Sequence, residues 1–429
     1  MFRRMFVVML IAAGVVTVGG RAAAAQGALD RVAEVQRAAV ESSPELAAAQ
    51  SEASLRGWEA RSEAAAVNPY LEWQSEGLGP SRTPNAQDTL RLGTTFNFPG
   101  QIGPARRLAQ AAERETMRAR SALADGAAVE ATRRWLELAA ALERVAVRRA
   151  RVEHLDLALN ILEARHQLGE VAGVEVAQLD LEYSTASAQL DLARADAAAL
   201  SHAVAVMCGR DFPPPEIGDL EDLVGGTSTP SGPHLETENL VSGAPMQVAD
   251  AAAELEATRS EVAAATAWGR PLIEAEWEHF PEVEGLESFD AWGFRLSVPL
   301  PIGSVGKRQR AAARERAATA TAVRDAALQE SLRAARELLA EAEGASQQLQ
   351  TLRPLIGDLD RIERSLSAQY RLGAITYLEY VYGTTRHDDV LLTTIDARRR
   401  LVAARLQLAL LLDDPDLFPI VEPSPEEAS

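Results

Sequence analysis

The chain is poor in cysteine and in aromatic residues. Its 429 residues include a single cysteine, Cys208, and only 5 % are aromatic. A lone cysteine excludes an internal disulfide and a thiolate metal cluster. Hydrophobic residues still reach 47 %, and many of them are alanine, whose small side chain lets helices approach closely. This composition indicates packed helices rather than one large apolar core.

A long apolar run and an excess of positive charge are also missing. After Gln26 no stretch of 18 apolar residues occurs, which excludes a transmembrane helix there, so membrane insertion would have to use β-strands. The formal net charge is −19, and it becomes −22 (−19 − 3) once Arg3, Arg4 and Arg21 leave with the leader described below. Such acidity disfavours nucleic acid as a partner.

Patterns typical of catalysis or metal binding are absent from the sequence. Residues 303–307 look like a phosphate-binding loop, but the spacing is wrong and Arg308 stands where serine or threonine is required. No Ser/His/Asp set or carboxylate pair stands out. We therefore expect no enzymatic activity, no cofactor and no metal site. The histidines form no ligand-spaced cluster, since they lie at positions 154, 166, 202, 234, 279 and 387.

The N-terminus has the pattern of a secretory signal peptide. Arg3 and Arg4 precede an apolar run from Phe6 to Val18, and the small residues 23–25 offer a cleavage site. A membrane anchor is the alternative, but the apolar run is short for a membrane crossing. We predict a signal peptide over residues 1–25 and export of the remainder.

The rest of the chain reads as two copies of one unit, residues 28–212 and 242–413. A duplicated unit indicates that neither copy buries its apolar stripes alone. We divide the mature chain into a first repeat, 26–212, a linker, 213–243, a second repeat, 244–413, and a disordered acidic tail, 414–429. The best-matched segments are 98–103 on 298–303 (offset 200), 68–72 on 270–274 (offset 202) and 167–169 on 371–373 (offset 204).

Each repeat is predicted to contain a helix, a β-hairpin, a very long helix and a return helix. At 1.5 Å per residue the long helices would each reach about 100 Å. In the first return helix, apolar residues recur in steps of four and three from Leu179 to Val204, which is typical of a coiled coil. The predicted ranges are 28–66, 69–99, 104–167 and 174–207 in the first repeat, and 244–268, 271–299, 304–371 and 375–412 in the second.

The strands of the predicted hairpins alternate strictly between apolar and polar residues. Leu71, Trp73, Trp292 and Phe294 lie on one face. Such alternation predicts strands between two different solvents, with lipid on the apolar side and water on the other. Four strands are too few for a wide barrel, so several identical chains would have to close it; a small sheet packed on the chain's own helices is the alternative. The polar face carries Glu72, Glu76, Arg91, Glu274, Glu276, Glu278 and Arg295.

This order of elements resembles the TolC family of outer-membrane efflux proteins over about residues 28–413. The turns at 68–69, 98–103 and 299–303 are most similar to its CzcC-like branch. The resemblance implies a mainly α fold with a small β part. It also implies a homotrimer in the outer membrane of a Gram-negative bacterium, in which a 12-stranded β-barrel continues as a 12-helix α-barrel in the periplasm.

The resemblance also implies roles for the turns between the long and return helices. It places these tips against a periplasmic membrane fusion protein, which acts as adaptor to an inner-membrane pump of the RND or ABC type. A plainer interpretation is that the glycines only permit a positive φ at a turn. The implied gate lies just past the second tip, at Glu379 and Tyr382. The implied docking residues are Leu168, Gly169, Val171, Leu372, Gly373, Ala374 and Ile375.

We therefore expect a passive exit duct for cations, drugs or other small molecules. The carboxylates of the polar face would concentrate cations in its lumen, or they simply keep a wet face polar. Two alternatives are an outer-membrane duct for type I protein secretion and a periplasmic coiled-coil scaffold outside the membrane. The apolar strand faces disfavour the scaffold.

Overall fold

The computed structural model describes residues 24–64, 69–76, 87–97, 99–227, 243–267, 269–282, 287–299, 305–414 and 417–418. The predicted signal peptide lies outside them up to residue 23, as do residues 228–242 of the predicted linker. Leu417 and Phe418, which the sequence placed in the acidic tail, are buried; the tail after Phe418 lies outside the described residues.

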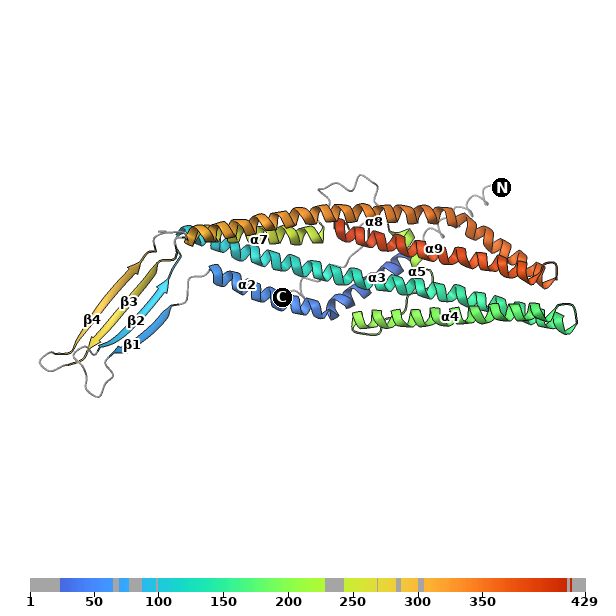
Figure 1. Cartoon of the computed structure of the whole chain (residues 1–429), viewed down its shortest axis with the longest axis horizontal. Helices are drawn as coiled ribbons and strands as arrows, with labels where there is room; N and C mark the ends of the chain where they lie inside the picture. Colours follow the sequence, from blue (N-terminus) through green and yellow to red (C-terminus); the bar gives the residue numbers. More distant parts are fainter. Residues whose placement is uncertain are drawn as a thin grey trace, which may run out of the picture. The chain divides into compact units, whose positions relative to one another are not determined.

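The described chain is mainly helical with one small antiparallel sheet, which confirms the predicted class (Figure 1). No helix among these residues combines the length and apolar character that a membrane crossing requires. The helices are α2 (Pro44–Ala64), α3 (Pro99–Gln167), α4 (Gly173–Cys208), α5 (Asp219–Gly226), α7 (Ala244–Ala265), α8 (Val305–Arg371) and α9 (Tyr377–Leu412). The strands are β1 (Tyr70–Glu76), β2 (Gln87–Thr95), β3 (Leu272–Phe280) and β4 (Phe289–Ser297).

Two helix starts differ from the sequence prediction, and a proline explains each. The helix expected over 28–66 is interrupted at Ser43, because Pro44 excludes the preceding residue from helical geometry and then starts α2. The Ser43 hydroxyl accepts a hydrogen bond from Leu46 N at 3.4 Å, as a helix cap does. The long helix α3 starts at Pro99 and contains Pro104, the residue at which the sequence had placed its start.

The chain packs as two compact units that cut across the two repeats. The first unit combines residues 1–46, 121–244 and 329–429, and the second combines 47–120 and 245–328. Each unit takes segments from both halves of the sequence, and α3 and α8 contribute to both. The two sequence repeats therefore stay a prediction about internal duplication. The compact units each combine segments of both repeats.

The second unit contains the sheet, whose strand order is β1-β2-β3-β4 with every neighbour antiparallel (Figure 1). The two hairpins are joined by β2 and β3, which come from different repeats. The register places apolar residues opposite one another: Leu90 pairs with Trp73 and with Trp277, and Trp277 pairs with Trp292. The alternation read from the sequence therefore becomes two chemically distinct faces.

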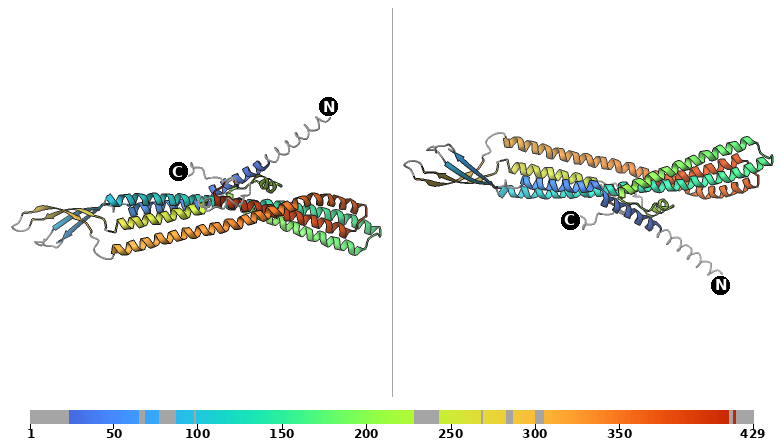
Figure 2. Two further views of the ribbon diagram at one scale, coloured as in Figure 1. Left: turned by 90° about the horizontal axis from the view of Figure 1, so that it is seen from above. Right: turned by 90° about the horizontal axis from the view of Figure 1, so that it is seen from below.

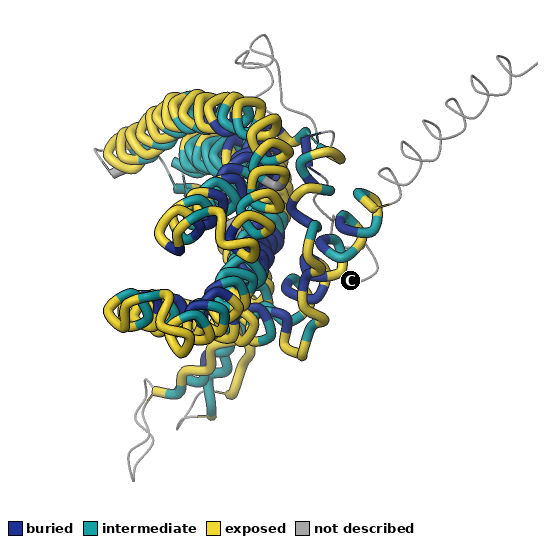
Figure 3. The backbone as a smooth tube through the Cα atoms, turned by 90° about the vertical axis from the view of Figure 1, so that its right-hand side faces the viewer, coloured by how far each residue is buried: buried dark blue, intermediate teal, exposed yellow. Residues whose placement is uncertain are grey.

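In the first unit, α3 and α4 pack as an antiparallel pair along the predicted stripe. Leu179, Ala186, Leu190, Ala197 and Val204 of α4 are buried. All of these except Val204 pack with α3 residues such as Leu155 and Val145 in two apolar clusters. Small and large residues thus alternate along the seam, which allows the close approach typical of a coiled coil. Figure 3 shows the buried stripes running along the helices.

We predict that the α4 seam carries much of the stability of this helix pair. Leu179 is fully buried, whereas Leu181 two residues later is exposed. Leu179→Ala should lower the free energy of unfolding by about 2–4 kcal/mol, because it leaves a cavity between the helices. Leu181→Ala is the matched control and should change it by less than about 0.5 kcal/mol. Thermal unfolding followed by circular dichroism measures both, and equal effects would contradict the assigned seam.

Candidate functional site

The sheet exposes its apolar face. Trp73 and Trp292 are 71 % and 72 % exposed, and Phe294 is 83 % exposed. On the opposite face Glu274 is only 4 % exposed. A sheet of a protein in water normally shows the reverse arrangement, with the apolar face covered and the polar face wet.

Charged side chains on the polar face pair across the strands. Arg91 of β2 lies 2.7 Å from Glu276 and 3.6 Å from Glu274, both on β3 (Nε to Oε1). Arg295 of β4 reaches Glu274 at 3.7 Å (Nη1 to Oε2). The register also places Glu72 opposite Arg91. The structure thus brings together most of the polar-face residues that the sequence singled out, around the carboxylate of Glu274.

Two other predicted polar-face residues lie outside this central cluster. Glu76, at the far end of β1, accepts a hydrogen bond from Gln74 Nε2 at 2.8 Å. Glu278 pairs in register with Thr89 and Ala291. The sequence also missed Tyr70, whose ring covers Gly93: a Cβ on that glycine would lie 2.5 Å from ring atoms. Only the register reveals this contact, because the two residues lie on different strands.

The two tips present leucines at tight turns. Leu168 and Leu372 are 75 % and 83 % exposed, and the glycines that follow have φ of 77° and 73°. Ala374 is also exposed. Val171 and Ile375 instead turn inward and pack against a buried cluster between the hairpins. The seven predicted docking residues therefore divide into an exposed set and two anchors that hold the turns.

Contacts between the hairpins fix the second tip. The Arg165 guanidinium of α3 donates to Tyr370 O near the end of α8 at 3.2 Å and lies 5.8 Å from the centroid of the Tyr370 ring. Tyr370 stacks on Tyr380 of α9 with ring centroids 4.8 Å apart. A Cβ on Gly373 would lie 2.9 Å from Arg165 Nη2. The positive φ of 73° therefore favours glycine here, and the movable end of the Arg165 side chain fills the space beside it.

Of the two predicted gate residues, Glu379 already has a local structural role. Its carboxylate accepts hydrogen bonds from the backbone N–H and the hydroxyl of Thr376, both at 2.9 Å, while its N–H donates to that hydroxyl. These contacts form a capping box at the start of α9 and lower the pKa of Glu379. The spacing Thr-x-x-Glu was readable in the sequence. The other residue, Tyr382, is exposed, and its hydroxyl accepts from Arg386 Nη1 at 3.3 Å.

Sequence reasoning missed a buried charged cluster between α3, α8 and α9. Glu363 of α8 bridges two histidines: its carboxylate lies 3.1 Å from His154 Nδ1 of α3 and 2.7 Å from His387 Nδ1 of α9. Asp388 beside them is buried, and burial raises its pKa to about 6, opposed by the charge of Arg151. More than 200 positions separate His154 from Glu363, so no local pattern announces the contact. Among the described residues, no group of three or more potential ligands is arranged to hold a metal ion.

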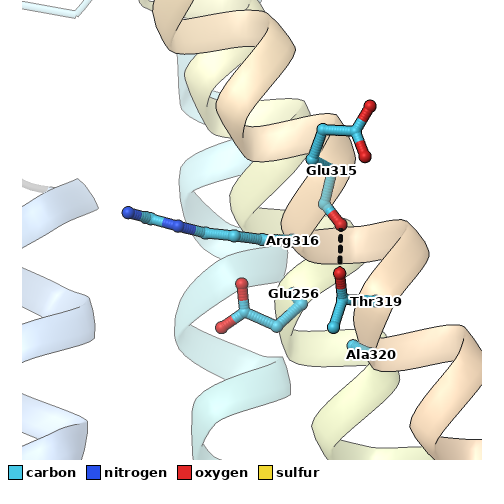
Figure 4. A pocket seen from close by; sticks show the side chains of 5 residues that line it. All are labelled: Glu256, Glu315, Arg316, Thr319 and Ala320. Carbon is cyan, nitrogen blue, oxygen red and sulfur yellow. Dashed lines mark hydrogen bonds between the residues drawn. The ribbon is translucent and has the colours of Figure 1, made fainter.

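An open pocket lies between α7 and α8 (Figure 4). Glu256 lines it from α7, and four residues of α8 line it from the other side: Glu315, Arg316, Thr319 and Ala320. The Thr319 hydroxyl donates to Glu315 O at 2.8 Å, within its own helix. No lining residue is a buried polar group, so the pocket shows helix packing rather than a binding site.

Long paired helices joined to a small antiparallel sheet define a class of protein. The chain has the fold of TolC-family outer-membrane channels. CusC has 13 % identity and a TM-score of 0.73 over 89 % of this chain and 92 % of its own. The CmeC outer-membrane channel of Campylobacter jejuni has 13 % and 0.70 over 93 % and 88 %. The outer-membrane protein VceC of Vibrio cholerae has 18 % and 0.66 over 89 % and 95 %.

No protein-family model matches the sequence, and no curated protein matches it either. At these identities the similarity to solved structures shows the fold.

The buried Asp388 makes the hairpins sensitive to pH. Its pKa is raised from 3.8 to about 6, so the folded protein holds a proton that the unfolded chain releases between these values. The contribution of Asp388 to stability should therefore fall as pH rises from about 4 to about 6 and change no further above that. Asp388→Asn should remove this slope and raise the free energy of unfolding at pH 8 by about 1–3 kcal/mol.

Thermal unfolding of the helical signal at several pH values between 4 and 8 measures this effect. Asp389→Asn is the control, because the neighbouring Asp389 is exposed and its charge should not alter the slope. An Asp388→Asn protein with an unchanged pH profile would refute the assignment.

Proposed function

We propose that the protein is the outer-membrane channel of a tripartite efflux system and acts as a passive exit duct. The observation that carries this proposal is the exposed apolar face of the sheet, opposite a polar face whose charges pair across the strands. The fold shared with outer-membrane channels supports it. The chain would lie in the outer membrane of a Gram-negative bacterium and extend into the periplasm.

Both edges of the sheet require partners under this proposal. β1 and β4 each pair with only one strand of the sheet. In lipid an unpaired strand edge is costly, because no water satisfies its N–H and C=O groups. Association of three copies, edge to edge, would pair every edge and close twelve strands into one barrel. The apolar face would then meet lipid and the polar face would line the lumen.

The polar face would set the electrostatic character of the lumen. It carries five carboxylates, of Glu72, Glu76, Glu274, Glu276 and Glu278, against the guanidinium groups of Arg91 and Arg295. Arg91 and Arg295 are engaged with Glu274 and Glu276. Glu72, Glu76 and Glu278 would supply most of the excess negative charge, which favours cations over anions.

The exposed tips suit docking of a periplasmic adaptor. Leu168 and Leu372 project from turns whose backbones are fixed by glycine and by inward-packed neighbours. Rigid apolar groups of this kind bind with little loss of conformational freedom. The adaptor, a membrane fusion protein, would link the duct to an inner-membrane pump that supplies energy and selects cations, drugs or other small molecules. Glu379 and Tyr382 would narrow the periplasmic end of the duct. The resemblance of the turns at 68–69, 98–103 and 299–303 favours the CzcC-like branch of the family.

Lipid contact of the apolar face is the decisive measurement. In purified protein reconstituted with brominated lipid, a variant whose only tryptophan is Trp73 should be quenched strongly. A variant that keeps only the buried Trp135 is the control and should be quenched weakly. Light scattering of the detergent complex should give three chains. Monomeric protein with Trp73 shielded from the quencher would favour the scaffold outside the membrane.

Aspartates introduced at the two tips test the proposed docking of the adaptor. In cells that depend on this channel for export, Leu168→Asp together with Leu372→Asp should reduce resistance to the exported compound at least tenfold, because two carboxylates would have to be buried against the adaptor. Leu168→Met with Leu372→Met keeps the tips apolar and should preserve export. Both variants should assemble normally, since these side chains are exposed. Full resistance in the aspartate variant would sink the docking role.

A further inference from the structure

Ion pairs join four helices of the second unit in the order α2, α3, α7, α8 (Figure 1), and Figure 2 shows α7 between α3 and α8. Arg56 of α2 pairs with Glu115 of α3 at 3.1 Å. At the far side, Arg324 of α8 pairs with Asp250 of α7. α2 and α8 form the two edges of this row in Figure 1.

An ion-pair ladder holds the middle of the row together. Arg107 and Arg114 of α3 lie 2.8 Å from Glu261 and Glu254 of α7 (Nη2 to a carboxylate oxygen). The two arginines are seven residues apart on α3, and the two glutamates are seven residues apart on α7. Both ion pairs therefore lie on one face of each helix. The same contact buries Leu108, Ala111 and Ala112 of α3 against Leu255 of α7.

The sequence repeat places matching charges on the two outer helices of the row, α8 and α2. The offset of 200 places Arg107 and Arg114 on Lys307 and Arg314 of α8. The offset of 202 places Glu254 and Glu261 on Glu52 and Glu59 of α2. The charges and the seven-residue spacing are kept at all four positions. α8 thus presents the basic half of a second ladder, and α2 presents the acidic half.

Both halves are exposed in the single chain. Lys307, Arg314, Glu52 and Glu59 are exposed, and the ion pair of Glu52 is with Arg56 of its own helix, at 2.6 Å. Ala111 and Ala112 are buried, but their counterparts on α8, residues 311 and 312, are exposed. The same structural position is therefore covered in one repeat and uncovered in the other.

One further feature fits a covered contact at these edges, and another makes the contact more electrostatic than that between α3 and α7. Leu55 is 58 % exposed and shares a face with Glu52 and Glu59, since it lies three and four residues from them. The counterpart of the buried Leu108 is Arg308, which is exposed and adds to the positive charge of the α8 edge. The α8 edge is thus more basic than the matching surface of α3.

We propose that α8 of one copy packs against α2 of a second copy, with Lys307 pairing with Glu59 and Arg314 with Glu52. The contact joins two different surfaces, so copies follow one another around a ring until it closes. This inference deepens the proposed function, on whose oligomer it rests, by naming the helix surfaces and charges that set the order of the copies. The α8 edge is basic and the α2 edge is acidic, so α8–α8 and α2–α2 contacts would bring like charges together. The charges therefore fix the direction in which copies follow one another.

Cross-linking tests the pairing directly. In full-length protein with Cys208→Ala, Glu52→Cys is combined with Arg314→Cys and treated with a short bis-maleimide. We expect dimer and trimer bands on a denaturing gel. The matched control combines Arg114→Cys with Glu254→Cys, the rung within one chain, and should give only intramolecular product. Chains carrying Glu52→Cys alone, mixed with differently tagged chains carrying Arg314→Cys alone, should cross-link to one another.

Charge reversal provides a second readout. Lys307→Glu with Arg314→Glu should reduce the oligomer fraction in detergent at least tenfold, as should Glu52→Lys with Glu59→Lys, and combining all four should restore it. If wild-type protein is trimeric but the Glu52–Arg314 pair cross-links only within one chain or not at all, the ladder is wrong while the proposed channel stands. If wild-type protein is monomeric in both detergent and lipid, both fail.

Discussion

The proposed function depends on the exposed apolar face of the sheet. Its outer face carries exposed tryptophan, phenylalanine and leucine, while Glu274 on the other face is covered by Arg91 and Arg295. Removing apolar surface from water gains about 25 cal/mol per Å², so a sheet in water normally buries such a face. An exposed apolar face opposite a face of paired charges is the arrangement expected of a sheet in apolar surroundings, and the proposed barrel rests on it.

Strand positions and the helix seam were readable from sequence because both rest on local periodicity. Alternation from Tyr70 to Glu76 needs only neighbouring residues, and so does the heptad stripe that buries Leu179. The helix starts were less accurate. Pro99, rather than Pro104, begins α3, because a proline inside a long helix was read as a boundary.

The candidate sites were predicted as sets of residues and not as contacts. Arg91 with Glu276 and His154 with Glu363 are pairs of residues far apart in the chain. No spacing rule links such residues, since tertiary packing alone brings them together. The capping role of Glu379 was different: Thr376 stands three residues before it, and this local signal was present but was read only as part of a gate. The internal repeat supports the proposed contact between copies, because it relates an observed contact to a surface that is exposed in the single chain.

The pairing of β2 with β3 has a consequence for biogenesis. Arg91 and Glu276 meet across 185 positions. At about 5–20 residues per second, a ribosome needs roughly 10–40 s to make the second strand after the first. Throughout that interval the first hairpin is an unpaired apolar ribbon, of the kind prone to aggregate. A truncated product that ends before β3 would carry a β2 edge that lacks its natural neighbour.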